Sequence, residues 1–275
     1  DPSCGSGTFP VLEIKRARAF IEEKMIPPTQ ALNMILENIV GYDLNPLAVI
    51  SARTNYLLAL GELLENRKEE ITIPIYLCDS IQTPSQGNDL FSQKAYGFLT
   101  SVGRFSIPQK LVHAHLIDKL TDLLEECVHQ QVTNEIFRKR LLYELPLIEI
   151  EDDYEINIVI ALYQQLTDLE QQGINGIWAR IIKNAFAPLF QGKFDYVAGN
   201  PPWVTWQNLP AEYRGASVHL WDFYKLFESS NTMERQVSSR VQVDISILLF
   251  YVCFDRYLHS NGKLGFIITQ SIFQS

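Results

Sequence analysis

The sequence is poor in the features that mark membrane-spanning, secreted and metal-binding proteins. Among its 275 residues, no apolar run approaches the roughly 20 residues that a membrane-spanning helix needs. The cysteines are few, lie far apart and form no CxxC or His/Cys metal spacing; they are Cys4, Cys78, Cys127 and Cys253. Scattered thiols are typical of the reducing cytoplasm rather than of a disulfide framework, and they predict no metal site.

Basic residues are also scarce for a protein that would bind nucleic acid. The net charge is −9 at pH 7, whereas phosphate contacts favour basic surfaces, so we expect this chain alone to bind a duplex weakly. A content of 47% hydrophobic and 20% charged residues is typical of a globular protein. The length suits one large α/β domain or a domain with an insertion.

Neither end of the chain has the character of a natural terminus. The chain opens on Asp1 with no initiator Met and no signal-like segment, and it stops just after an apparent strand. We therefore expect it to be an internal piece of a longer protein.

Short apolar runs that indicate buried strands alternate with helical patterns. The predicted strands cover residues 39–43, 71–79, 193–199 and 263–269, and the predicted helices cover 11–25, 27–38, 45–65 and 244–262. The last helix is expected to stop at Asn261-Gly262, after a polar, irregular stretch from 204 to about 242. This alternation predicts an α/β fold with a parallel, doubly wound sheet, which binds ligands at the carboxyl ends of its strands. Those ends carry Asp1, Asp43, Asp79 and Asn200.

Strongly helical sequence interrupts this alternation in the middle of the chain. We expect three parts: residues 1–80 as one half of the sheet domain, 81–193 as a mainly helical insertion, and 194–275 as the other half.

The opening stretch DPSCGSGTF places Gly5 and Gly7 directly before a predicted helix. Glycine permits unusual φ and ψ and close backbone approach, and a helix start offers free N–H groups. A G-x-G-x-x-G spacing is absent because Pro10 stands at its third position, and no Lys-Ser/Thr follows to form a phosphate loop. The turn therefore fits a ligand that lies against backbone better than a nucleotide phosphate.

Two acids at predicted strand ends complete this pattern. Asp43 is placed to accept hydrogen bonds from ribose hydroxyls, and Asp79 from an adenine amino group. Each acid alone is better explained by capping a helix or closing a turn. The set in this order, after the glycine turn, favours a ligand.

Four motifs in this order, DPSCGSGTF, GYDLNPLAV, LCDS and NPPW, resemble the amino-methylating DNA methyltransferases that use S-adenosylmethionine. With GNPPWVTWQNLPAEYR and DISILLFYVCFDRYL…GKLGFIITQSIF, the chain is similar to the Eco57I-like adenine-specific methylases of restriction–modification systems. The resemblance covers most of the chain and is weak in the helical insertion. It implies a Rossmann-like methyltransferase core in which residues 1–80 are the cofactor-binding half and 194–275 the catalytic half.

The resemblance also implies the ligands and the site. S-adenosylmethionine would be the cofactor, double-stranded DNA the partner, and N6 of a flipped-out adenine the methylated group, with target recognition in a separate region after the core. The implied cofactor contacts are Asp1, Cys4, Gly5 and Gly7 around the methionine part, Asp43 at the ribose, Leu44 at the adenine ring and Asp79 at the adenine amino group. Pro2, Thr8 and Ser80 are further implied cofactor contacts. In this fold the strand before the glycine turn lies mid-sheet, and a chain that starts at Asp1 lacks nearly all of it. Hydrogen-bonding groups of the two neighbouring strands would then be buried and unpaired, so we expect the chain by itself to fold poorly and not to methylate.

The Asn-Pro-Pro-Trp turn matches the needs of amine methylation. An exocyclic amino nitrogen is a poor nucleophile because its lone pair is delocalised into the ring. The Asn200 side-chain oxygen and the Pro201 carbonyl would hold its hydrogens out of the ring plane, and Pro201 and Pro202 keep these acceptors rigid. Trp203 supplies a flat face for a flipped base. Asn at the first position favours, by resemblance, N6 of adenine over N4 of cytosine.

The residues after this turn have two interpretations each. Aromatic residues could line the base pocket or simply pack; they are Trp206, Trp221, Phe223 and Phe273. Basic residues could meet phosphates or form a solvated loop; they are Arg214, Lys225, Arg235 and Arg240.

Three other functions stay open. Protein glutamine methyltransferases use a similar N-P-P-Y turn, although Trp203 and the long insertion favour DNA. RNA methyltransferases that act on guanine N2 share a D-P-x-C-G-S-G turn, and methylation of adenine N6 in RNA is a related alternative. The third alternative is a fragment that does not act alone.

Overall fold

The structure is a computed structural model that describes residues 1–68, 70–86, 95–100, 103–113, 116–145, 153–173, 178–227 and 244–268. The chain forms two compact units. The first unit joins Asp1–Gln82 to Lys193–Ser275, and the second unit is Thr83–Gly192.

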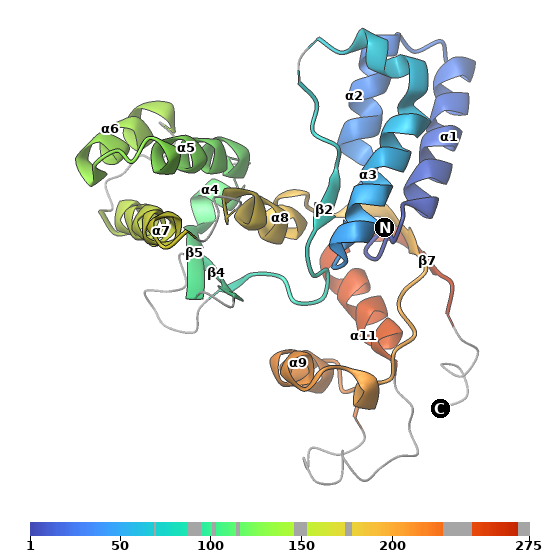
Figure 1. The fold of residues 1–275 in the computed structure, drawn as a ribbon. Helices are drawn as coiled ribbons and strands as arrows, with labels where there is room; N and C mark the ends of the chain where they lie inside the picture. The colour runs from blue at the N-terminus through green and yellow to red at the C-terminus, as the bar shows by residue number, and fades with distance from the viewer. Residues whose placement is uncertain are drawn as a thin grey trace. The chain divides into compact units, whose positions relative to one another are not determined.

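Three helices lie side by side in the first unit, in the blue part of the ribbon (Figure 1). They are α1 (Thr8–Glu23), α2 (Pro28–Asn38) and α3 (Pro46–Leu60), which continues as the 3-10 helix η1 (Gly61–Asn66). All three lie within a few residues of their predicted positions. Tyr56 of α3 is fully buried, and its hydroxyl lies 3.1 Å from the carbonyl oxygens of both Ile35 and Ile39. These contacts fasten α3 to the end of α2.

The start of α3 follows directly from the local sequence. Asn45 precedes the helix, and its side-chain oxygen accepts hydrogen bonds from the N–H groups of Leu47 at 3.0 Å and Ala48 at 3.4 Å. Pro46 occupies the first turn, where its missing N–H costs nothing. This cap fixes the loop after Asp43 in place.

Pro46–Asn66 is also long and apolar enough to cross a membrane by length and composition alone, although we expected no such run. A core helix of a globular protein meets the same criterion. The Arg53 side chain lies in this stretch and donates to the Ile75 carbonyl at 2.8 Å, so the helix packs against a strand of its own unit.

The strands of the first unit form two parallel pairs. β1 (Gly41–Asp43) pairs with β2 (Ile75–Leu77), and β6 (Phe194–Gly199) pairs with β7 (Leu258–Phe266). Within the described residues no strand ladder joins the two pairs, so the continuous doubly wound sheet that we predicted is not confirmed. The fold is mixed α/β with small sheets.

The second half of the first unit differs from the sequence prediction in two places. The stretch after the Asn-Pro-Pro-Trp turn, predicted to be irregular, contains η3 (Trp206–Asn208) and α9 (Ala211–Phe223). The helix predicted to stop at Asn261-Gly262 ends earlier, because α11 (Ile245–Val252) passes into a π-helical turn, η4 (Cys253–Tyr257), and then into β7. Gly262 lies in β7, where a Cβ would come within 2.7 Å of Leu258 Cδ1, so its role is close packing within a strand.

The second unit contains a small sheet as well as helices. Its antiparallel sheet has the order β3-β4-β5, made of β3 (Ser85–Gln86), β4 (Ala95–Thr100) and β5 (Gly103–Pro108). The helices are α4 (Gln109–His113), α5 (Ile117–His129), α6 (Asn134–Glu144), α7 (Asp153–Gln171) and α8 (Trp178–Phe190). The sequence pattern indicated helices here and missed the strands.

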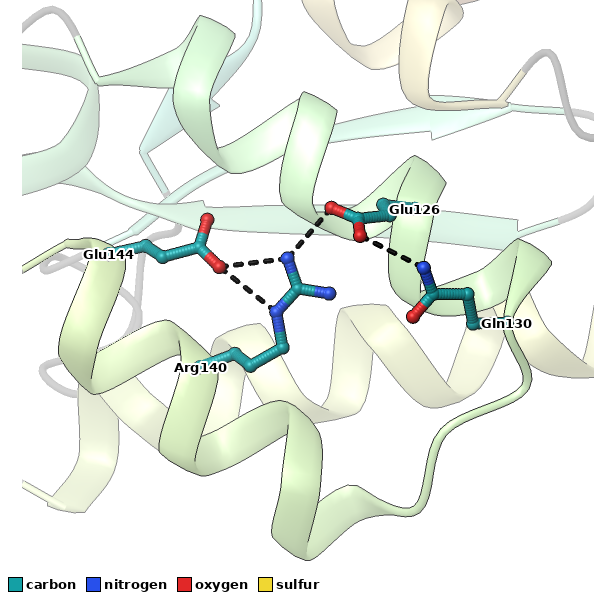
Figure 2. A network of polar contacts seen from close by, with 4 residues as sticks. All are labelled: Glu126, Gln130, Arg140 and Glu144. Atoms are coloured by element: carbon teal, nitrogen blue, oxygen red, sulfur yellow. Dashed lines mark hydrogen bonds and ion pairs between the residues drawn. The ribbon is translucent and has the colours of Figure 1, made fainter.

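A surface network joins α5 to α6 in the second unit, as Figure 2 shows. The Arg140 guanidinium contacts Glu126 at 2.7 Å and Glu144 at 2.8 Å, and the Gln130 amide also donates to Glu126 at 2.9 Å. The hydrogen bond from Arg140 holds the pKa of Glu126 below its usual range. Because these groups are exposed, the network orients the two helices and adds little stability.

Candidate active site

Four loops meet in the first unit at the ends of β1, β2 and β6. The glycine turn at residues 1–7 contacts each of the other three loops. The connecting hydrogen bonds run from Gly5 N–H to Asp43 Oδ2 (2.8 Å), from Ser80 Oγ to the Pro2 carbonyl (2.7 Å) and from Ser3 Oγ to the Asn200 carbonyl (3.4 Å). The strand-end residues singled out in the sequence therefore belong to one connected cluster.

The two glycines of the turn do different things. Both adopt the left-handed region, with φ of 53° at Gly5 and 89° at Gly7. A Cβ on Gly7 would lie 3.1 Å from both Cα and Cβ of Ala52, so Gly7 permits the close packing of α1 on α3. At Gly5, no atom of the described residues lies within 4 Å of the Cβ position. The main chain at Gly5 is therefore open to a ligand.

Asp43 closes a turn and keeps acceptor capacity. Its Oδ2 accepts the Gly5 N–H, and its Oδ1 accepts the Asn45 N–H at 2.8 Å. A carboxylate oxygen has two lone pairs, so each oxygen can accept a further hydrogen bond. Leu44 follows, is 58% exposed and can offer an apolar surface to a ring.

Asp79 is held more tightly. Its Oδ1 accepts the N–H groups of Ile81 at 2.7 Å and Gln82 at 3.0 Å. Burial raises the pKa of Asp79, and the N–H groups of Gln82 and Ile81 and the Tyr213 hydroxyl oppose the rise because they favour the charged form. The next residue, Ser80, is buried and receives a hydrogen bond from the Tyr257 hydroxyl at its carbonyl (2.6 Å).

The other predicted cofactor residues differ in which of their groups a ligand can reach. Asp1 uses Oδ1 to accept the Ser3 N–H at 3.0 Å. Pro2 and Cys4 are buried, so only their main chain can meet a ligand. Burial raises the pKa of the Cys4 thiol to about 12, and the thiol stays protonated at neutral pH. Thr8 is exposed at the first residue of α1.

The Asn-Pro-Pro-Trp turn follows β6 and faces outward. Asn200 and Pro202 are exposed, Pro201 is buried, and Trp203 is 53% exposed. The Trp203 indole N–H donates to the Ile267 carbonyl at 3.3 Å, while the Ile267 N–H donates to the Gly199 carbonyl at 3.1 Å. Trp203 is therefore a fixed surface aromatic and not a core residue.

The residues beyond this turn divide between packing and surface. Trp221 is fully buried and packs against Trp206 and Phe227, with ring centroids 5.0 and 5.3 Å away. Phe223 and Lys225 are exposed, and Arg214 is half-buried. The remaining candidates, Phe273, Arg235 and Arg240, lie outside the described residues.

Sequence reasoning missed Ser3 and Tyr257, which hold the cluster together, and Tyr213, whose hydroxyl favours the charged form of Asp79. Ser3 lies inside the recognised turn, and its hydroxyl was a signal that could have been used. The two tyrosines come from α9 and η4, far along the chain, and nothing in their local pattern indicates a partner. Within the described part of the chain, no group of three or more His, Cys, Asp or Glu residues could hold a metal ion.

A family model described as Eco57I restriction-modification methylase matches residues 37–275, which is most of the chain. The chain belongs to this family. The match includes the Asp43, Asp79 and Asn200 loops of this methylase, while the glycine turn precedes it. No curated protein and no solved structure matches the chain.

Membership of this family makes the protein a methyltransferase of the restriction-modification type, whose substrate is DNA. The resemblance seen in the sequence motifs is thereby confirmed at the level of the family.

Proposed function

We propose that this methylase transfers a methyl group from S-adenosylmethionine to N6 of an adenine flipped out of double-stranded DNA. The observation that carries the proposal is Trp203, which is half-exposed yet fixed by its hydrogen bond to Ile267, beside the exposed Asn200. A base inside a duplex is unreachable and must be extruded, and an aromatic face compensates for part of the lost stacking.

The cofactor would bind across the three loops that precede this turn. S-adenosylmethionine supplies a methyl group on a sulfonium sulfur. The open main chain at Gly5 suits its methionine part, flanked by Asp1, Pro2, Cys4, Gly7 and Thr8. Asp43 would accept from the ribose hydroxyls, Leu44 would contact the adenine ring, and Asp79 with Ser80 would hold the adenine amino group.

The Asn200 turn would prepare the nucleophile. The Asn200 side-chain oxygen and the Pro201 carbonyl would each accept one hydrogen of the adenine amino group. With its hydrogens held out of the ring plane, the amino nitrogen presents its lone pair to the methyl group. The N–CH3 bond would form as the S–CH3 bond breaks, S-adenosylhomocysteine would leave, and the nitrogen would then release one proton. Because Pro201 and Pro202 restrict the backbone, these acceptors need no reorganisation as positive charge develops. Trp203 would stack on the base.

The proposed function includes a proposal for the whole sheet. The pairs β1-β2 and β6-β7 would be parts of one doubly wound, Rossmann-like sheet. Asp1 supports this arrangement, because its carbonyl accepts the Tyr42 N–H at 2.9 Å while a Cβ on Gly199 would come within 2.6 Å of its Oδ1. Residues 1–80 and 194–275 would then be the cofactor-binding and catalytic halves, with 81–193 inserted between them.

The acidic balance of the chain bears on how DNA is held. A net charge of −9 disfavours a duplex, so we place the recognition of the target sequence in a separate region of the cytoplasmic protein.

The experiment uses the complete gene, expressed in a host that lacks DNA methylation. Genomic DNA would be digested to nucleosides and analysed by mass spectrometry, beside an Asn200→Ala control expressed at the same level. We expect N6-methyladenine that vanishes in the control. N4-methylcytosine instead would overturn the adenine assignment, and unmodified DNA with methylated RNA would overturn DNA as the substrate.

A further inference from the structure

The glycine turn is held from α3 at the residue between its two left-handed glycines. The side-chain Nδ2 of Asn55 donates to the Ser6 carbonyl at 2.9 Å, across 49 residues of sequence. Gly5 and Gly7 on either side have φ of 53° and 89°, and glycine has more backbone freedom than any other residue. The Asn55 contact therefore fixes the most pliable part of the turn.

Two further contacts hold the glycines themselves. The Gly5 N–H donates to Asp43 Oδ2 at 2.8 Å, at the loop that leads into α3, and a Cβ on Gly7 would lie 3.1 Å from Ala52. Ala52 and Asn55 are three residues apart on α3 and so lie on one face of that helix. One face of α3 thus supports the turn at two successive residues.

The hydrogen bonds of the turn leave one N–H group for a ligand. The Gly5 N–H donates to Asp43, and the Gly7 N–H donates to the Cys4 carbonyl at 2.8 Å. Within the described part of the chain the Ser6 N–H has no acceptor, and Ser6 is exposed. A carboxylate is a strong acceptor for a main-chain N–H group. The turn is therefore suited to the carboxylate of an amino acid.

The asparagine at position 55 is not explained by α3 itself. Alanine forms helices better than asparagine does, and Asn55 is exposed in the interior of the helix. Its amide hydrogen bond leaves the helix and reaches the glycine turn. By contrast, the hydroxyls of Ser51 and Thr54 donate to carbonyls of α3 itself, at 2.9 and 3.0 Å. The contribution of Asn55 is therefore made at the turn.

We propose that Asn55 is a positioning residue for the methionine part of S-adenosylmethionine. Its amide holds the Ser6 carbonyl on α3, so that the glycine turn keeps the shape in which it meets the amino-acid end of the cofactor. This inference rests on the proposed function, which places that end at Gly5. A turn that is fixed before binding loses less conformational entropy when the ligand binds. Asn55 therefore contributes to affinity without touching the ligand.

The test compares two ligands that differ only at the amino-acid end. S-adenosylhomocysteine and 5′-methylthioadenosine share the adenosine and the thioether sulfur, and only the first has an amino group and a carboxylate. Their binding to the full-length protein would be measured by titration calorimetry for the wild type and for Asn55→Ala. We expect the wild type to prefer S-adenosylhomocysteine. Asn55→Ala should weaken that ligand about fivefold and change 5′-methylthioadenosine by less than about twofold, since one neutral hydrogen bond that fixes the turn is lost.

Asn66→Ala is a matched control. The Asn66 amide also donates to a main-chain carbonyl, that of Glu62 at 3.4 Å, but within η1, which continues α3. We expect this variant to bind both ligands as the wild type does. The same selective loss in Asn66→Ala would overturn the specific role of Asn55. If Asn55→Ala does not fold, Asn55→Leu keeps the size of the side chain without its donor and should give the same selective loss.

Steady-state kinetics separate positioning from a merely structural role. In Asn55→Ala the KM for S-adenosylmethionine should rise about fivefold, with kcat at saturating cofactor within about twofold of the wild type. A fall in kcat with an unchanged KM would overturn the inference.

The outcomes distinguish this inference from the proposed function. If the wild type binds neither ligand, the proposed cofactor is wrong, and the inference fails with it. If the wild type binds both ligands equally, the placement of the methionine part at the glycine turn fails, and so does the inference. A wild type that prefers S-adenosylhomocysteine, beside a folded Asn55→Ala with unchanged preference, would overturn the role of Asn55 alone. Equal weakening of both ligands would also overturn it, because it would indicate a general packing defect.

Discussion

The main-chain N–H of Gly5 donates a hydrogen bond to Oδ2 of Asp43 at 2.8 Å, across 38 residues of sequence. This contact joins the glycine turn to the end of β1, and Asp43 uses its other oxygen to hold Asn45, the cap of α3. The residue proposed to bind the ribose therefore also builds the loop around it. Mutations at Asp43 should affect stability and cofactor binding together.

Asp43→Ala should lower the free energy of unfolding by about 1–3 kcal/mol, because it leaves the N–H groups of Gly5 and Asn45 without their acceptor. Cofactor binding should be lost in the same variant. Denaturant unfolding and calorimetry with S-adenosylmethionine would measure the two effects. Asp195→Ala removes an exposed acid from β6 and should change stability by no more than about 0.5 kcal/mol; equal effects of both substitutions would contradict the account.

Gly7→Ala should destabilise the protein more than Gly5→Ala. Both substitutions force alanine into positive φ, at a cost of about 1–3 kcal/mol each. Only Gly7 adds a clash, since its new Cβ would lie 3.1 Å from Cα and Cβ of Ala52. Unfolding curves of the two variants isolate this difference. Gly5→Ala should instead show its larger effect in S-adenosylmethionine affinity, and the reverse ranking would argue against an open main chain at Gly5.

S-adenosylmethionine binding should weaken on acidification because of Asp79. Burial raises the pKa of this carboxyl above its ordinary value of 3.8, so the acceptor is protonated at a higher pH than an exposed acid would be. Affinity should fall as pH falls through the raised pKa. Titrations over a series of pH values would measure this, and Asp79→Asn should bind weakly with no such dependence.

The raised pKa of Asp79 affects the stability of the protein in the opposite direction from cofactor affinity. A raised folded-state pKa means that the folded protein holds this proton more firmly than the unfolded chain does. The contribution of Asp79 to the free energy of unfolding is therefore present below pH 3.8 and is lost as pH rises through the folded-state pKa. Urea unfolding of wild type and Asp79→Asn across this pH range would measure the free energy of unfolding of each protein. The difference between the two free energies should shrink at low pH.

Trp203 and Trp206 should respond in opposite ways to substitution by alanine. Trp203 is 53% exposed, so Trp203→Ala should leave the melting temperature nearly unchanged and weaken DNA methylation, since base stacking on an aromatic is worth about 1–3 kcal/mol. Trp206 packs against the buried Trp221, so Trp206→Ala should lower the melting temperature. Thermal melts and methyl-transfer rates would show whether the two tryptophans separate in this way.

Short sequence patterns predicted much of this fold correctly. Asn45 and Pro46 predicted the start of α3 because a cap and a first-turn proline act over a few residues. The end of α11 was mispredicted because Asn261-Gly262 suggested a helix stop, while packing of Gly262 within β7 decided the outcome. The strands β3, β4 and β5 were missed because strand pairing depends on distant partners.

In the candidate site, too, local motifs were predicted from the sequence and contacts between distant residues were not. The order of the four motifs identified the loops that the hydrogen bonds of Gly5, Ser80 and Ser3 connect. Tyr213 and Tyr257 were not predicted, because their contacts with Asp79 and Ser80 depend on the tertiary fold.

The most direct test of the account is methyl transfer in vitro by the full-length protein. Tritiated S-adenosylmethionine and unmethylated genomic DNA would be incubated with wild type and with Asn200→Ala, and the labelled nucleosides separated. We predict label in N6-methyladenine from the wild type and none from Asn200→Ala, although both proteins bind S-adenosylmethionine with equal affinity. Undiminished transfer by Asn200→Ala, or label in any other nucleoside, would contradict the account.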